Sequence, residues 1–88
     1  MPNKVTVKKS EKTDWVNRMK PAKRFIVGRL KDLDKTQTSL GKALSIDRAQ
    51  VTRLLDGDRR VRLDEVETLA RHLDISTIEM LRRLGLNL

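Results

Sequence analysis

Apolar residues recur at helical spacing along most of this 88-residue chain, and turn-forming residues separate the resulting segments. The clearest pattern lies between Gln37 and Leu54, where each apolar pair falls on one helix face. The apolar positions of this stretch are Leu40, Leu44, Ile46, Val51 and Leu54. Ile46 lies between the two pairs, where it can fill the angle between two helices. The pattern therefore predicts two short helices joined by a tight turn, with the first beginning at Gln37.

Capping residues place the ends of both helices. Thr36 precedes the first helix and can accept a hydrogen bond from its first turn. Asp47 is followed three residues later by Gln50, which is an Asp version of the capping box and places the start of the second helix near Arg48. Gly57 follows the last apolar pair, where a left-handed residue commonly ends a helix. We therefore expect the second helix to span about residues 47–55.

Three further helices are expected on the same grounds. One begins at Pro21, which suits a first helical turn, and runs to Leu33 around a stripe of Phe25, Ile26, Leu30 and Leu33, with Gly28 inside it. Gly28 marks either a close approach of another backbone or a cost that the helix tolerates. A fourth helix spans Leu63–Leu73, with Leu63, Val66, Leu69, Ala70 and Leu73 as its apolar side. A capping box at Ser76–Glu79 opens the last helix, which Gly85 closes. Its apolar side comprises Ile78, Leu81 and Met80 or Leu84. Together these segments predict an all-α bundle of about five helices around a central helix-turn-helix.

The first twenty residues differ from the remainder of the chain. Residues 1–13 are polar and basic, and we expect a largely disordered arm there that either lies along a polyanion or is an untethered terminus. Residues 14–20 can form a short extra helix, with Trp15 packed on the domain. The chain is therefore divided into a basic arm at 1–20 and a helical domain at 21–88.

Composition restricts the chemistry that the chain can perform. It has no cysteine, one histidine and 2% aromatic residues, so neither a disulfide framework nor a metal site is expected. His72 is interpreted as structural, near a helix C-terminus where a partly charged imidazole is favourable. No nucleophile–base spacing, glycine-rich phosphate loop or ligand set is present, so we expect no catalytic residues, no cofactor and no enzyme activity. Apolar runs are too short for a membrane span or a signal peptide, which predicts a cytoplasmic protein.

The net charge of +8 is unevenly distributed. Residues 1–33 carry +7, residues 34–62 carry +3, and residues 63–88 carry −2. A basic front and a slightly acidic rear predict that one face meets a polyanion. Solubilising surface charge is the alternative interpretation.

The second helix of the central pair presents a polar and basic face away from its apolar anchors. This face comprises Arg48, Ala49, Gln50, Thr52 and Arg53. Two helices at a steep angle, of which the second is exposed and basic, match the geometry of a helix that enters a DNA groove. Beyond it, the loop arginines Arg59, Arg60 and Arg62 are placed to reach the flanking phosphates, although exposed arginines without a ligand would look the same.

From about Ala22 to Leu84, the chain resembles the phage-repressor-like helix-turn-helix family, also called the lambda-repressor/Cro or XRE family. The resemblance rests on Thr36, Gln37, Leu40, Gly41, Leu44, Ile46, Val51, Arg53, Leu54 and Gly57, and on the stretch 63–81. Three positions depart from the family pattern: Gly41 replaces the usual alanine, and Ser45 and Asp74 replace glycines. At both of these positions, the residue that replaces glycine must adopt the left-handed backbone conformation.

The resemblance implies a set of DNA contacts. It assigns base contacts to Arg48, Ala49, Gln50 and Arg53, and phosphate contacts to Gln37, Thr38 and Thr52, in addition to the loop arginines. Arginine can bond guanine, glutamine can bond adenine, and the alanine methyl can meet thymine. Asp47 is assigned as a helix cap. Family members commonly act as homodimers, often through the last helix, which points here to Met80, Leu84, Leu86 and Leu88.

These observations predict a transcriptional regulator that binds double-stranded DNA, as a repressor at a two-fold operator, in the cytoplasm and nucleoid of a bacterial or phage-infected cell. The alternatives are the DNA-binding module of a larger repressor whose effector domain is missing, or an antitoxin-type regulator that also binds a protein partner. RNA binding is disfavoured because no aromatic platform is present to stack unpaired bases.

Overall fold

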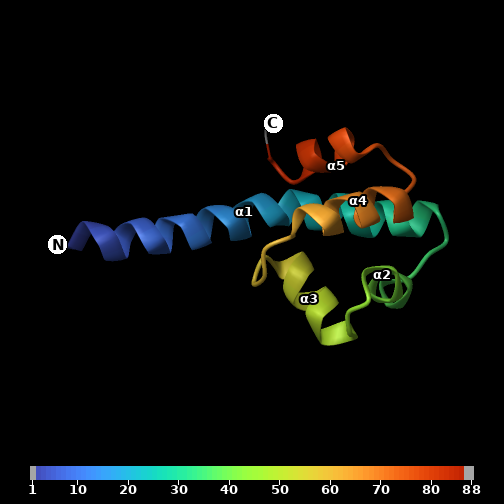
Figure 1. Ribbon diagram of the computed structural model, residues 1–88, viewed down its shortest axis with the longest axis horizontal. Helices are drawn as coiled ribbons and strands as arrows, with labels where there is room; N and C mark the ends of the chain where they lie inside the picture. The colour runs from blue at the N-terminus through green and yellow to red at the C-terminus, as the bar shows by residue number, and fades with distance from the viewer. Residues whose placement is uncertain (1, 87–88) are drawn as a thin grey trace.

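A long first helix supports the other elements. The computed structural model describes residues 2–86, with side chains from residue 14 onward, and in this part of the chain it contains helices and no strand (Figure 1). The helices are α1 (Pro2–Asp32), α2 (Gln37–Leu44), α3 (Arg48–Asp56), α4 (Leu63–His72) and α5 (Thr77–Arg83). The predicted all-α fold with a central helix-turn-helix is confirmed.

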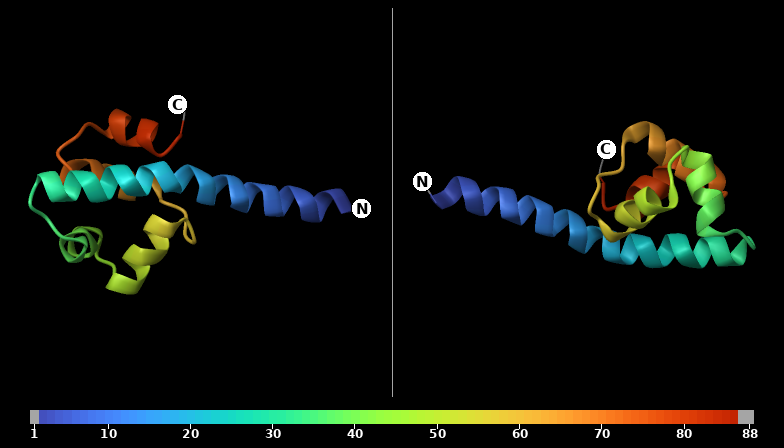
Figure 2. Two further views of the ribbon diagram at one scale, coloured as in Figure 1. Left: turned by 180° about the vertical axis from the view of Figure 1, so that it is seen from behind. Right: turned by 90° about the horizontal axis from the view of Figure 1, so that it is seen from below.

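The helices lie on two sides of α1. Figures 1 and 2 show α2 and α3 on one side of α1 and α5 on the other, while the N-terminal half of α1 projects beyond the bundle. α1 contacts both α3 and α5, and α4 contacts α2 and α5. None of the helices in residues 2–86 is long and apolar enough to cross a membrane.

The core is aliphatic, apart from one tryptophan. Its buried members are Trp15, Met19, Ala22, Ile26, Leu30, Leu40, Val51, Leu54, Leu55, Val66, Leu69, Ala70, Leu73, Met80, Leu81 and Leu84. Trp15 is packed into this core, as predicted, with 5% of its surface exposed. Every helix contributes to one cluster, so the orientation of α3 is fixed by packing against the whole domain.

The N-terminal region corrects three expectations. The structure has one helix from Pro2 to Asp32 in place of a disordered arm, a short helix and a new helix starting at Pro21. Trp15, Met19 and Ile26 form one continuous buried stripe across Pro21, and burying them outweighs the hydrogen bond that the proline removes, which costs about 3 kcal/mol. Figure 2 shows α1 changing direction near this point. Whether residues 1–20 act as a separate arm stays a prediction.

The predicted caps of α2, α3 and α5 are confirmed. The Thr36 hydroxyl accepts a hydrogen bond from the Ser39 N–H at 3.1 Å, and the Asp47 carboxylate accepts one from the Gln50 N–H at 2.8 Å. The Ser76 hydroxyl caps α5 in the same way. Each cap satisfies one otherwise unpaired donor of a first helical turn, which explains where these helices begin.

Left-handed residues end the helices where the sequence placed them. Ser45 and Asp74 have φ values of 58° and 57°, and Gly57 and Gly85 have φ values of 86° and 73°. Ser45 ends α2 as its C-cap, with its N–H directed to the last carbonyls of that helix. The turn between α2 and α3 therefore keeps its left-handed conformation although serine stands where the resembled family usually has glycine.

Two apolar positions do not lie where the stripes placed them. Leu63 and Ile78 are 68% and 65% exposed, whereas Met80 and Leu84 are fully buried. In α5, Met80 and Leu84 share the inward face, and Ile78 lies on the opposite face because it is two residues before Met80. Leu63 occupies the first turn of α4, beyond the region that neighbouring helices cover.

The predicted dimer contacts need a corresponding correction. Met80 and Leu84 are wrong as dimer contacts because they already lie in the core. Leu86 is partly buried against the same core, and Leu88 lies outside the described residues. Gly28 has open space around it, because a Cβ at this position would meet nothing within 4 Å. The predicted alternative of a close approach by another backbone is therefore wrong.

Candidate nucleic-acid interface

The outward face of α3 presents the residues that the sequence singled out. Arg48, Ala49, Thr52 and Arg53 are exposed, and Gln50 is half-buried. The opposite face of the helix is buried in the core through Val51, Leu54 and Leu55. Neither Arg48 nor Arg53 forms an ion pair with any side chain that the structure describes. Their guanidinium groups therefore remain available to an external acceptor.

A close approach between α2 and the following turn fixes the angle of α3. A Cβ on Gly41 would lie 2.9 Å from the Ile46 carbonyl oxygen and 3.1 Å from a methyl carbon of Val51. Real side chains do not tolerate the first of these distances, so the absence of a side chain allows this approach. The glycine that departs from the family pattern thus has a packing role at the turn that aims α3.

The C-terminal end of α3 is fastened to α1. Lys23 of α1 pairs with Asp56 at 2.7 Å, and the Trp15 indole N–H lies 3.4 Å from the Arg59 carbonyl oxygen. A Cβ on Gly57 would lie 2.9 Å from the Val16 Cα, so helix and loop are in direct backbone contact. α1 consequently sets the depth to which α3 projects from the domain.

The three loop arginines have different surroundings. Arg59 donates two hydrogen bonds to Glu65, at 2.9 and 2.7 Å, in a bidentate pair with a carboxylate that is 5% exposed. Arg60 is exposed, with its guanidinium 5.2 Å from the centre of the Trp15 ring. Arg62 is 70% exposed, with its Nε 3.5 Å from the Asp64 carboxylate. The charge of Arg59 is thus already paired inside the domain, and the phosphate contacts of the three arginines stay predictions.

Glu65 holds the loop by two kinds of contact. Its carboxylate accepts the Arg59 bonds and also a bond from the Arg62 N–H at 2.9 Å. The hydrogen bonds from Arg59 are the main reason that the pKa of Glu65 lies below its usual 4.5, despite an opposing effect of burial. Its charged form is therefore part of the folded loop at neutral pH.

We expect Glu65→Gln to lower the free energy of unfolding by about 1–2 kcal/mol at pH 7, because the amide cannot replace the charged pair. Because the folded pKa is lowered, the stabilisation is present above about pH 4.5 and is lost as the pH falls through the folded value. The difference between variant and parent should therefore shrink in acid. Urea unfolding at several pH values measures it. Glu67→Gln changes an exposed residue of the same helix and should alter the free energy of unfolding only a little. An equal loss of stability in both variants would contradict the role assigned to Glu65.

The N-terminus of α2 lies at the edge of the same interface. Gln37 and Thr38 are exposed in its first turn, where unpaired backbone N–H groups and the helix dipole favour a phosphate. Ser39 ties this turn to α4, since its hydroxyl lies 2.6 Å from the Thr36 carbonyl oxygen and 3.1 Å from His72 Nε2. Lys35 adds a bond of 2.6 Å to the His72 carbonyl oxygen.

His72 is structural, but its charge state differs from the expectation. Ser39 has one hydroxyl hydrogen, which points to the Thr36 carbonyl, so His72 Nε2 is the donor in the contact between the two side chains. Burial, with a smaller effect of Lys35, lowers the pKa of His72 below its usual 6.5. The imidazole is therefore neutral at pH 7, which corrects the expected partial charge.

Protonation of His72 is expected to destabilise the fold. The unfolded imidazole takes up a proton more readily than the folded one, so its contribution to stability falls as the pH drops from about 6.5 through the folded pKa. His72→Gln keeps an N–H donor for Ser39 and should flatten the dependence of stability on pH in that range. Thermal unfolding between pH 7.5 and 5 checks this; an unchanged slope would contradict it.

The geometry described here defines a class of protein: a helix-turn-helix with an exposed basic second helix. A family model described as the Cro/C1-type HTH DNA-binding domain matches residues 28–83. The chain belongs to this family, and it is a DNA-binding protein of the regulatory type. Comparisons with curated proteins and with solved structures returned no match.

Proposed function

We propose that the chain is a transcriptional repressor that binds a two-fold DNA operator as a homodimer, with α3 in the major groove. The observation that carries the proposal is the exposed face of α3, whose two arginines have no partner among the described side chains. A face that the fold leaves polar, basic and unpaired is suited to the donor and acceptor pattern of base edges.

In this proposal, base contacts come from Arg48, Ala49, Gln50 and Arg53. Phosphate contacts come from Gln37 and Thr38 at the start of α2, from Thr52, and from the exposed loop arginines Arg60 and Arg62. Arg59 contributes by holding the loop through Glu65. The two arginines of α3 favour at least one G·C pair in each half-site.

Dimerisation is proposed on physical grounds. A single domain of this size makes too few base contacts for high specificity, and a two-fold operator doubles them at a fixed half-site spacing of about one helical turn. The site of action is the DNA of a bacterial or phage-infected cell.

A second candidate function keeps the DNA-binding face and adds a protein partner, as in an antitoxin-type regulator or the module of a larger repressor. Leu63 and Ile78, which are exposed although apolar, favour it, because such residues occur at interfaces. Co-purification of the tagged chain from its host, followed by mass determination of the complex, distinguishes a stoichiometric partner from a homodimer.

Selection of bound duplexes from a random DNA pool at about physiological salt tests the main proposal. We expect an enriched two-fold motif with half-sites about one helical turn apart. The salt dependence of the affinity is then measured for the selected duplex and for bulk DNA. If all sequences bound weakly and lost binding equally at high salt, only non-specific electrostatic attraction would be present. That result would contradict the proposal.

A further inference from the structure

A groove of about 530 Å³ lies between α1 and α5 and has no part in the DNA interface. Its lining residues are Arg18, Pro21, Glu79, Arg82, Arg83 and Gly85. α5 lies on the side of α1 opposite to α2 and α3 (Figure 1). The groove is therefore exposed on the rear of the domain when α3 faces DNA, and a ligand bound there would leave the DNA-reading face free.

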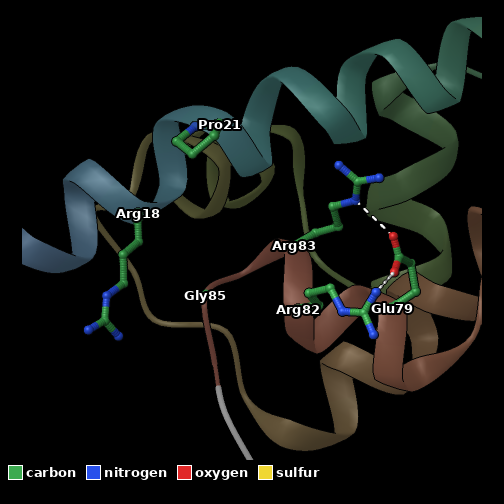
Figure 3. Close-up of a pocket in the computed structure, with 6 residues that line it drawn as sticks. All are labelled: Arg18, Pro21, Glu79, Arg82, Arg83 and Gly85. Atoms are coloured by element: carbon green, nitrogen blue, oxygen red, sulfur yellow. Dashed lines mark hydrogen bonds and ion pairs between the residues drawn. The ribbon is translucent and has the colours of Figure 1, made fainter.

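The groove carries an excess of positive charge. Three arginines line it against one carboxylate, Glu79, which lies 3.4 Å from Arg82 and 2.9 Å from Arg83. Figure 3 shows these two arginines on either side of Glu79, with Arg18 on the far side of Gly85. Arg83 is also held over the Phe25 ring, at 4.3 Å from its centre. One glutamate cannot neutralise three arginines, so the groove keeps a net positive charge and attracts anions.

Arg18 and Arg82 are the two arginines most available to a ligand. The side-chain stem of Arg18 lies against the backbone at Gly85, where a Cβ would be 3.5 Å from it. Its guanidinium forms no ion pair with any described side chain, although Asp14 lies one helical turn earlier. Arg82 keeps 75% of its side-chain surface exposed beside Glu79. The guanidinium of Arg18 is a free donor on the α1 wall of the groove, and that of Arg82, although ion-paired with Glu79, keeps exposed N–H groups on the α5 wall.

Pro21 gives the groove features that an inorganic anion cannot use. Its ring lines the groove and carries no N–H. The exposed ring supplies an apolar surface beside the arginines. On α5, the exposed Ile78 lies one helical turn before Arg82.

We propose that this groove binds an acidic peptide segment of a partner protein. Carboxylates of the segment pair with Arg18 and Arg82, and an apolar side chain covers the Pro21 ring. A DNA backbone would satisfy the arginines only, because phosphodiesters have no apolar side chain to bury. The combination of arginine donors and apolar surface thus selects a peptide over a nucleic acid.

The test uses the full chain and two fluorescein-labelled octapeptides. One repeats Glu-Leu-Asp-Ala twice, and the other repeats Gln-Leu-Asn-Ala twice, which keeps the shape and removes the charge. Fluorescence anisotropy at about 50 mM salt measures binding, because screening is modest there. Two double variants with the same change in net charge are compared: Arg18→Glu with Arg82→Glu, and Arg48→Glu with Arg53→Glu. Both pairs are exposed, and thermal unfolding confirms that each variant folds.

We expect the acidic peptide to bind the parent chain, the amide peptide to bind at least about tenfold more weakly, and the groove variant to lose about tenfold or more of the affinity. The α3 variant should keep peptide binding and lose DNA binding, and the groove variant should do the reverse. Absence of binding, equal weakening in both double variants, or equal binding of both peptides would overturn the proposal. Because DNA affinity is measured separately, failure here is distinguishable from failure of the proposed repressor function.

Discussion

Gly57→Ala is expected to lower the free energy of unfolding by about 2–4 kcal/mol, the largest effect of any single methyl group in this domain. Two costs combine at this position. Gly57 has a φ of 86°, which an L-residue adopts at a cost of about 1–2 kcal/mol. The added Cβ would also lie 2.9 Å from the Val16 Cα, and backbone cannot give way as the end of a side chain can. The loop and α1 would have to separate.

Gly28→Ala provides the matched control for this prediction. It adds the same methyl group inside a helix where nothing lies within 4 Å, and it should raise stability by about 0.5–1 kcal/mol because alanine favours the helix. Urea unfolding of the two variants beside the parent chain measures both changes. Similar effects for the two alanines would show that the contact between Gly57 and α1 is not formed as described.

Arg53→Ala is expected to weaken operator binding by about 1–3 kcal/mol, or roughly 5- to 150-fold, and to relax the preference at one base position. The reason is that an exposed arginine without an internal partner loses only its external contact when it is truncated. Stability should change by less than about 0.5 kcal/mol, as for other surface positions. Affinities for the selected operator and for single-base variants of it measure both parts of the effect.

Arg82→Ala separates base reading from general attraction to DNA. It removes the same charge from α5, on the other side of α1, and should reduce affinity only slightly and equally for all sequences. If Arg53→Ala weakened binding to every duplex by one common factor, Arg53 would be a phosphate contact, and the proposed base assignment would be wrong.

Features with local causes could be predicted from the sequence. Thr36, Asp47 and Ser76 each cap a helix with a hydrogen bond that spans three residues, so neighbouring residues decide it. The left-handed conformations of Ser45 and Asp74 follow in the same way from the helix ends at which they lie. These local signals are sufficient to place α3 and its exposed face.

Features that depend on distant neighbours could not be predicted in this way. The periodicity around Leu63 and Ile78 identifies a helix but does not tell how far the packed surface extends, and both residues are exposed. The sequence predicts a helix start at Pro21, because Trp15 and Ile26 form a common stripe only when both lie on one helix. A carboxylate in the first turn of α4 was a signal that could have identified Glu65 as the partner of the loop arginines.

The contact between His72 and Ser39 joins residues that are 33 positions apart, and nothing in the local pattern marks it. The lowered pKa of His72 follows from burial of the imidazole, with a smaller effect of Lys35. Sequence reasoning gave the correct structural role and the wrong charge state, since the role follows from position in a helix and the charge from tertiary surroundings.

The exposed face of α3 contributes little to the stability of the domain. Arg48, Ala49 and Arg53 point outward, while the core, the caps and the contacts with α1 hold the helix in place. Under the proposed base contacts, binding preference can therefore change by substitution at these positions, with no compensating change elsewhere in the fold. For an engineer, a library randomised at these three codons would consist mostly of folded proteins, and we propose that these would differ in the DNA sequences they bind.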